Sequence, residues 1–552
     1  MDVGLSKKIE KAYSIQTQDW KPQSRQEWPA KKKLKVGHRN KDIDDFAKDI
    51  NAYVKKRKWV FPTEVVHFIS DIHADADAFF KSLVGAGMIE KTGKADSDFT
   101  LTKKALQGKL IIGGDCLDKG PSNLRLLDAI KLVKDAGMKT VILAGNHDFR
   151  TYVGLKIGEE RKLVAEHMFV RMGKKTIPLF REIYRKYLHK HIDVKNLPSA
   201  EEVEDRLFPS KAWFDSYGEK MSGLIPPMKI EKEIIRIQEK IIDVRNYLDR
   251  TGFTHGMLYA TLEKARELFF NPKGEYAWFF NEMKLAHQEG SFLFVHAGVD
   301  DFSTDWLGQA GVDGLNEKFD ILKRNDPFEL YHGHLGNMFR TKYRDVDFPF
   351  TKGSVKKINN LGIQAIVHGH RNTVQGHRIT IKRGLLNFEC DTSLDRKTRI
   401  EEGLPGYGAS WFTIHPKGVV EAYSTDYPAI KKFDLKKVGG KMAKKLPSNV
   451  KVEDVPSLKL TKKSKISAVS NENRLQAKEI FKRLSDDFLE GVVKIEDEKE
   501  AFVSAIPENV ELKFNGQQDG DFGQLNIQIT WGEKPIKKTK NDKSSKKSKK
   551  KK

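Results

Sequence analysis

Five short motifs rich in aspartate, histidine and asparagine occur along this chain, and each follows a run of apolar residues. They are Asp71-Ile72-His73, GDCLDKG at 114–120, GNHD at 145–148, His296-Ala297-Gly298 and His368-Gly369-His370. Each motif alone is common, and a single histidine at a strand end is usually an ordinary polar residue. Five in this order indicate one site built from carboxylate, imidazole and amide ligands.

These residue types suit two metal cations that share a ligand. Two cations about 3.5–4 Å apart need a carboxylate that touches both, and Asp115 is the candidate. Asp71 and His73 are separated by one residue, so their side chains share one face of an extended segment and can bind the first cation. The second cation would take an amide oxygen and two imidazoles. The candidates for these ligands are Asn146, His296 and His370.

Such a centre predicts ester hydrolysis. A hydroxide held between two cations is a nucleophile near neutral pH, because the cations lower the pKa of water. His147 adjoins the ligand Asn146 but is directed elsewhere, which suits protonation of the leaving alkoxide. A histidine in this role needs an orienting carboxylate, and Asp118 is our candidate.

The apolar runs in front of the motifs predict a layered α/β enzyme. VVHFIS, KLIIGGD, TVILAGN, SFLFVHAG and QAIVHGH are short and rich in β-branched residues, which is typical of strands covered on both faces. Helices are expected between them at 76–85 and 123–136, and later strands at 385–389 and 409–415. In such sheets the polar residues at the strands' carboxyl ends form the site.

The five motifs resemble the calcineurin-like metallophosphoesterase superfamily, and within it the phosphoprotein-phosphatase type. That family's pattern is GDxHG, GDxxDRG, GNHE, HGG and a late GH. The stretch 65–149 looks most like the Shewanella-like bacterial branch, and the resemblance covers about 61–430 apart from an insertion. It implies a four-layer αββα fold, a centre of two Mn, Fe or Zn ions with Mn the first choice in vitro, and hydrolysis of phosphorylated small molecules or phosphoproteins.

The resemblance assigns the ligand, acid and orienting roles to the same residues, but the sequence departs from the family at three positions. The family arginine after the second aspartate is Lys119, so that a bidentate phosphate clamp becomes a single charge. Ala74 stands in place of glycine and Asp148 in place of glutamate. A second phosphate-binding arginine is expected between the last two histidine motifs, where Arg340 and Arg344 are both candidates.

A helical insertion interrupts this domain at about 150–290. Apolar residues recur within it at spacings of 4, 3, 4, 3 and 4, a heptad pattern that predicts a long helix. They are Ile230, Ile234, Ile237, Ile241, Val244 and Leu248. The helix is expected either to form a hairpin lid over the site or to pack on the body of the enzyme.

Composition predicts five parts in all. The metallophosphoesterase domain at 61–430 follows a basic N-terminal arm at 1–60, which holds a short helix near 45–54. A Lys-rich linker at 431–465 leads to a small α+β domain at 466–533 and a poly-Lys tail at 534–552. The small domain resembles the bacterial amphi-Trp domain. Its expected elements are a helix at 471–489 and strands at 492–496, 510–514 and 524–531.

The net charge of +23 is concentrated at the C-terminus. The tail holds eleven Lys and one Asp, hence +10, which leaves +13 for the other 533 residues. Such a tail is expected to be disordered, and it either makes a weak nucleic-acid contact or only keeps the protein soluble. Two cysteines, Cys116 and Cys390, exclude a disulfide scaffold and a CxxC zinc site. Since an apolar span and a signal sequence are both missing, we expect a cytoplasmic protein without a membrane span.

Three functions remain open from the sequence. The leading one is a dinuclear-metal phosphoesterase acting on phosphomonoesters, with phosphoproteins among its candidate substrates. The alternative is a nucleotide-polyphosphate or nucleic-acid phosphodiesterase, which the basic arm and tail favour. A non-catalytic binding protein is disfavoured, because converging carboxylates and imidazoles are costly to bury without a metal.

Overall fold

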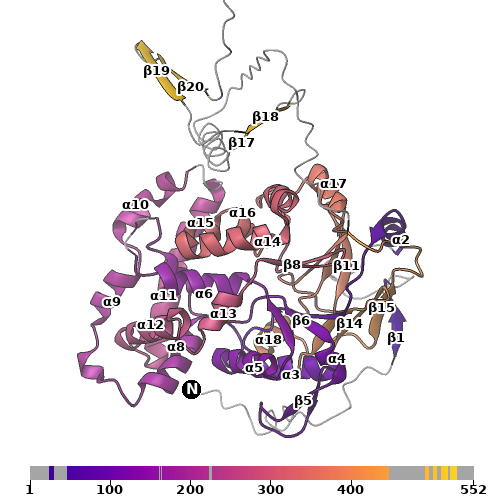
Figure 1. The fold of residues 1–552 in the computed structure, drawn as a ribbon. Coiled ribbons are helices and arrows are strands. Elements are labelled where there is room, and N and C mark those ends of the chain that lie inside the picture. The colour runs from indigo at the N-terminus through magenta and orange to yellow at the C-terminus, as the bar shows by residue number, and fades with distance from the viewer. Residues whose placement is uncertain are drawn as a thin grey trace, which may run out of the picture. The chain divides into compact units, whose positions relative to one another are not determined.

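The computed structural model describes residues 24–29, 47–160, 162, 164–222 and 227–446, and four strands nearer the C-terminus. The chain divides into two compact units, Met1–Val455 and Pro456–Lys552. All five motifs lie in the first unit, whose two sheets and surrounding helices can be followed in Figure 1.

The first sheet carries the motifs nearest the N-terminus. Its strand order is β1-β15-β14-β13-β3-β6-β7. β3 (Val65–Ile69), β6 (Gly108–Ile112) and β7 (Lys139–Ile142) run parallel to one another, and β13 (Ser410–Ile414) pairs antiparallel with β3. Because parallel strands end at the same edge, the three motifs that follow β3, β6 and β7 come together there.

The second sheet carries the two histidine motifs. Its order is β11-β12-β10-β9-β8, in which β9 (Phe292–Val295), β10 (Ala365–His368) and β12 (Leu385–Glu389) are parallel. β8 (Ala286–Glu289) and β11 (Arg378–Lys382) are antiparallel edge strands. His296 and the motif ending in His370 therefore follow neighbouring strands.

The two sheets pack face to face across a core of aromatic side chains. The ring centroids of Phe68 and Phe294 lie 5.7 Å apart, and those of Phe388 and Phe412 lie 5.0 Å apart. All four side chains are buried. Such close-packed pairs fix the two sheets against each other and so fix the loops at their edges.

Helices cover the outer faces of the sheets and complete four layers. α3 (Ala76–Gly85) packs against β13 of the first sheet, and α14 (Asp301–Asn325) packs against β8 of the second. The Asp75 side chain accepts a hydrogen bond from the backbone N–H of Ala78 and so starts α3 where the sequence predicts. This α/β architecture confirms the predicted fold class.

The insertion forms a helical lobe beside the sheets (Figure 1). Its longest helix is α11 (Pro227–Thr251), which packs against α7 (Met168–Met172) and α10 (Lys211–Lys220). Ile237, Val244 and Leu248 of the heptad pattern are buried there. The pattern therefore reflects a helix that packs against other helices of the insertion.

The first unit extends beyond both predicted limits of the metallophosphoesterase domain. β15 (Ile430–Asp434) pairs with β14 (Val419–Ser424), and β1 (Arg25–Glu27) pairs with β15. The expected arm and the start of the expected linker thus supply strands of the first sheet. The Lys-rich composition of these segments did not predict strands. Their few apolar residues, such as Phe433 and Leu435, are nevertheless buried.

The second unit contains two antiparallel strand pairs. β17 (Val492–Glu496) pairs with β18 (Ala501–Ala505), and β19 (Glu511–Asp519) pairs with β20 (Phe522–Thr530). Three of these strands overlap the predicted ones, and β18 was not expected. The predicted helix at 471–489 and the tail at 534–552 lie outside the described residues.

Helix length and hydropathy give no candidate for a membrane-spanning helix in the described part of the chain.

Candidate metal centre

The first group of candidate ligands lies at the ends of β3 and β6. One ligand atom each from Asp71, His73 and Asp115 lies within 4.8 Å of the others. His73 Nε2 is 3.9 Å from Asp115 Oδ2, and all three side chains are buried. The structure therefore brings the three residues predicted for the first cation into one cluster.

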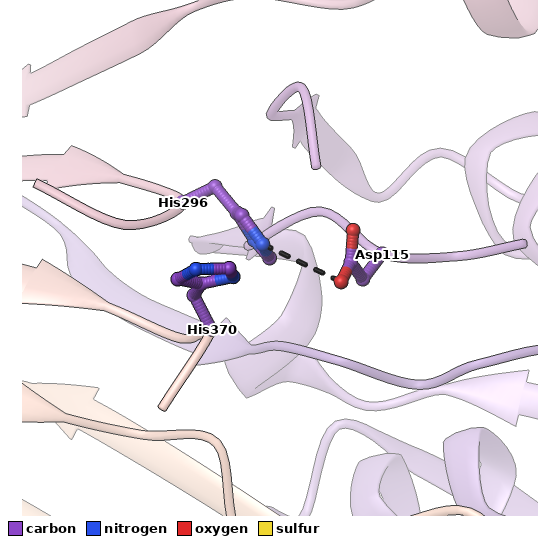
Figure 2. A group of neighbouring side chains, drawn as sticks. All are labelled: Asp115, His296 and His370. Atoms are coloured by element: carbon purple, nitrogen blue, oxygen red, sulfur yellow. Dashed lines mark ion pairs between the residues drawn. The ribbon is translucent and has the colours of Figure 1, made fainter. Parts of the chain in front are cut away.

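The second group shares Asp115 with the first. His296 and His370 each place a ring nitrogen within 4.8 Å of an Asp115 carboxylate oxygen and of one another. Figure 2 shows this group, with His296 Nε2 paired to Asp115 Oδ2 at 3.5 Å. Asn146 Oδ1 lies 3.2 Å from the same His296 nitrogen. All six predicted ligands thus converge, with Asp115 between the two groups.

The pKa values of the two buried carboxylates at this site fit cation binding. Burial, together with the negative charge of Asp115, raises the pKa of Asp71 to about 6 against the opposing effect of His296. Burial works in the same direction on Asp115, but the charges of His296 and His147 outweigh it and hold the pKa of Asp115 well below its usual range. Two closely placed buried carboxylates flanked by imidazoles form the donor set that hard and borderline cations prefer.

Strained backbone marks the same positions. Ten non-glycine residues in the described part of the chain have a positive φ, and six of them are predicted site residues. The six are Asp71, His73, Asp115, Asp118, Lys119 and His370. A left-handed conformation costs a non-glycine residue about 1–2 kcal/mol. The surrounding fold therefore holds these side chains in place at a cost in stability, as is typical of functional sites.

Two motif glycines allow the ligand loops to approach closely. A Cβ atom on Gly145 would overlap the backbone nitrogen and the carboxylate of Asp115, and one on Gly369 would overlap the Asp71 carboxylate. The backbone N–H of His370, next to Gly369, donates to Asp71 Oδ2 at 3.0 Å. Glycine is required at both positions because a backbone passes directly beside a ligand carboxylate.

The predicted acid and its partner are hydrogen-bonded. His147 Nδ1 lies 2.9 Å from Asp118 Oδ2, and Arg150 Nη2 donates to the same oxygen at 2.7 Å. Thr176, in the insertion, donates from Oγ1 to the other oxygen of Asp118 at 3.0 Å. Asp118 is thus held at both oxygens, and the ring of His147 is held through it.

The predicted phosphate-binding residues take different positions. Lys119 Nζ lies 2.8 Å from His73 Nε2 and therefore reaches the candidate metal centre. Arg340 accepts a hydrogen bond from His370 Nε2 at its carbonyl, 3.1 Å away, while its guanidinium lies over the Tyr331 ring. Arg344 is ion-paired with Asp347, and its side chain is 60% exposed. The structure therefore brings the backbone carbonyl of Arg340, but not the Arg344 side chain, next to the ligands.

Several residues beside the site were not predicted from the sequence. Ser70 donates from Oγ to Asp71 Oδ2 at 2.6 Å, and Arg150 and Thr176 contact Asp118 as described. Asp391 follows β12 and is buried; burial, with the charge of Asp71 added, raises its pKa well above its usual range. Arg150 lies one helical turn after His147 in α6 (Asn146–Ile157), a spacing that could have indicated it. Thr176 is remote in sequence from every motif and gave no signal.

Residues 65–228 match the family model described as calcineurin-like phosphoesterase. The matched segment begins with β3 and contains the first four candidate ligands along the chain. This segment is similar in sequence to calcineurin-like phosphoesterase domains. The prediction of a metal-dependent phosphoester hydrolase is therefore confirmed at the level of enzyme class, and with it the expectation of divalent metal ions and phosphorylated substrates.

Solved structures give distant similarities to the phosphoesterase domain and its surroundings. A cold-active protein-tyrosine phosphatase from a psychrophilic Shewanella species is 12% identical, with a TM-score of 0.36, over 68% of this chain and 83% of that one. A protein serine/threonine phosphatase from Saccharomyces cerevisiae with similarity to human phosphatase PP5 is 10% identical, with a TM-score of 0.31, over 69% and 91%. No curated protein sequence matches the chain. The assignment rests on the family match and not on these TM-scores.

Proposed function

We propose that this protein hydrolyses phosphomonoesters at a dinuclear metal centre. The observation that supports the proposal most directly is the position of Asp115, which belongs to both groups of candidate ligands. A carboxylate shared in this way is what two adjacent cations require.

Asp71, His73 and Asp115 would hold the first cation, and Asn146, His296 and His370 would join Asp115 at the second. When bound, two such cations supply Lewis acidity toward the phosphoryl oxygens and a hydroxide nucleophile near neutral pH. Carboxylate, amide and imidazole ligands without thiolates suit Mn, Fe or Zn, with Mn the first choice in vitro.

His147 is the proposed general acid and Asp118 its positioning partner. Burial, together with the charge of Arg150, lowers the pKa of His147 to about 4 against the opposing charges of Asp115 and Asp118. The ring is therefore neutral at pH 7 until a negatively charged phosphoryl group arrives and raises its pKa. It then takes up a proton and gives it to the leaving oxygen. Lys119 and Arg340 would bind the phosphoryl oxygens.

Finer assignments follow from the resemblance seen in the sequence. The domain would belong to the phosphoprotein-phosphatase type, in its Shewanella-like branch, and phosphoproteins would be among its substrates. The C-terminal unit would be an amphi-Trp-like domain, and the protein would act in the cytoplasm. The nucleotide-polyphosphate or nucleic-acid phosphodiesterase remains the alternative, because the basic tail offers a contact for polyanions.

A comparison of two aryl esters tests the proposal. The metal-loaded protein should hydrolyse 4-nitrophenyl phosphate at least tenfold faster than bis(4-nitrophenyl) phosphate, and a chelator should abolish both reactions. A preference for the diester would favour the phosphodiesterase. Metal binding without turnover of either ester would favour the binding protein.

A further inference from the structure

Lys119, the residue in place of the family arginine, has its ammonium group against a candidate metal ligand. Lys119 Nζ lies 2.8 Å from His73 Nε2 and 3.4 Å from Thr398 Oγ1 of α18 (Arg396–Glu402). His73 Nδ1 faces the carbonyl oxygen of Leu117 at 3.2 Å, so Nε2 carries the lone pair of the ring. That lone pair serves either the ammonium group or a cation. Lys119 therefore needs another partner once His73 binds a cation.

The start of α18 holds a buried carboxylate oxygen without a donor. Asp395 is the N-cap of α18, and its Oδ1 accepts from the backbone N–H of Thr398 at 2.8 Å. The residue is 0% exposed, and its Oδ2 has no hydrogen-bond partner in the described part of the chain. Burying a carboxylate oxygen without a donor is costly. We therefore expect a donor to reach Oδ2 in the working protein.

Thr398 contacts both Lys119 and Asp395. Its hydroxyl lies 3.4 Å from Lys119 Nζ, and its backbone N–H donates to Asp395. Burial raises the pKa of Asp395, and the charge of Lys119 opposes this effect. No ion pair within 4.0 Å joins the two residues among the described contacts, and the ammonium group lies on His73 instead. Asp395 thus offers Lys119 a second position beside the same threonine.

Arg396 fixes this turn to the first ligand motif. Its backbone N–H donates to Asp75 Oδ2 at 3.2 Å, and its Nε lies 3.0 Å from the same oxygen. Asp75 follows His73 by two residues and is buried. The carboxylate of Asp395 is therefore held at a fixed place relative to the ligand loop that Lys119 contacts.

We propose that Asp395 is the positioning residue of Lys119 and holds its ammonium group in place for the phosphoryl group of the substrate. When His73 binds a cation, the ammonium group leaves Nε2, pairs with Asp395 Oδ2 and keeps its contact with Thr398. Lysine is a point charge on a flexible stem and lacks the fixed fork of arginine, so the carboxylate supplies the orientation. This inference rests on the proposed function, in which Lys119 binds the phosphoryl oxygens.

Asp391 is the other carboxylate that must be distinguished from Asp395. It is buried, and its Oδ1 accepts from the backbone N–H of Ser393 at 3.2 Å. Burial and the charge of Asp71 raise its pKa well above the usual range, while Lys119 acts in the opposite direction. Asp395 Oδ2 is the oxygen that lacks a donor, and the ammonium group is therefore assigned to Asp395.

A double-mutant cycle between Lys119 and Asp395 tests the inference. Asp395→Asn keeps an oxygen for the N–H of Thr398, because asparagine caps helices about as well as aspartate, but it removes the charge that attracts Lys119. The inhibition constant of inorganic phosphate against 4-nitrophenyl phosphate should rise roughly tenfold, the order expected for a charged hydrogen bond. In the Lys119→Met background the same change should have no effect. Asp326→Asn is the matched control, since Asp326 is the exposed N-cap of α15 (Pro327–His332), and it should change nothing.

Mn binding gives a readout that does not depend on turnover. In Asp395→Asn the ammonium group stays on His73 and competes with the cation, so Mn should bind several-fold more weakly than in the wild type. This loss should be absent when Lys119→Met is added, because no ammonium group then competes.

Equal effects of Asp395→Asn in the two Lys119 backgrounds, or no effect in either, would overturn the inference and leave the proposed function intact. Coupling of Lys119 to Asp391, measured with Asp391→Asn in the same cycle, in place of coupling to Asp395 would also overturn it. Failure of the wild-type protein to hydrolyse 4-nitrophenyl phosphate would instead overturn the proposed function, while the Mn titrations would still report whether Lys119 and Asp395 are paired.

Discussion

In the proposed function, departure of the leaving group depends on the pair formed by His147 and Asp118. Burial alone would raise the pKa of Asp118, but the hydrogen bond from His147 and the charge of Arg150 hold it well below its usual range. Asp118 is therefore a permanent anion that fixes the orientation of the imidazole. Thr176 donates to one of its oxygens, and His147 and Arg150 contact the other, so that the imidazole ring is held in one orientation.

Replacement of His147 should affect substrates unequally. We expect His147→Asn to lower kcat for alkyl phosphates by about 10²–10³-fold, because general acid catalysis contributes on that order when the leaving oxygen needs a proton. The loss should be much smaller for 4-nitrophenyl phosphate, whose leaving group departs as an anion. Steady-state kinetics over a series of leaving groups measures this, and a uniform loss would argue against the acid role.

At the scale of elements, the helical insertion is joined to the catalytic pair through the turn before α8 (Ile177–Ile183). Thr176 at that turn is buried and donates to Asp118 Oδ1. α11 supports the same turn through Lys240. The lobe therefore has a positioning role toward the site that a helix packed elsewhere would lack.

Loss of the Thr176 hydroxyl tests this role. Thr176→Val keeps the side-chain shape but leaves Asp118 Oδ1 without its donor, and we expect kcat to fall roughly tenfold, the order expected for a hydrogen bond to a charged group. Thr176→Ser should restore most of the activity. The loss should be greatest for poor leaving groups, since Thr176 acts through His147. If valine and serine behave alike, Thr176 does not position the pair.

The elements that were predictable are those whose signal is local. Strands β3, β6 and β12 and helix α3 combine apolar runs with polar residues at their ends, and they lie where the sequence indicates. The convergence of the six candidate ligands was predictable for the same reason. Thr176 and the pairing of β1 with β15 depend on contacts between segments far apart in the chain, and periodicity carries no record of those.

At the scale of the whole molecule, the protein consists of a catalytic unit and a separate C-terminal unit followed by a basic tail. The candidate ligands and His147 all lie within Met1–Val455. The tail at 534–552 carries +10 of the net charge and almost no apolar residues. The basic tail and the candidate metal centre thus lie in different parts of the chain.

Deletion of residues 534–552 should separate these two properties. We expect turnover of 4-nitrophenyl phosphate to be unchanged and any affinity for RNA or DNA to fall, most strongly at low salt, where counterion release contributes most. Binding titrations of both proteins at two salt concentrations measure this. Unchanged nucleic-acid affinity, or loss of small-substrate turnover, would contradict an independent electrostatic tail.

The central claim is that Asp115 joins two metal sites, and metal stoichiometry measured together with turnover tests it most directly. The wild-type protein, saturated with Mn and freed of excess, should hold two ions per chain. Asp115→Asn should hold fewer than two and lose at least about 10²-fold in kcat for 4-nitrophenyl phosphate, with an unchanged circular dichroism spectrum. An Asp115→Asn protein that retains two ions and near-normal turnover would contradict the account.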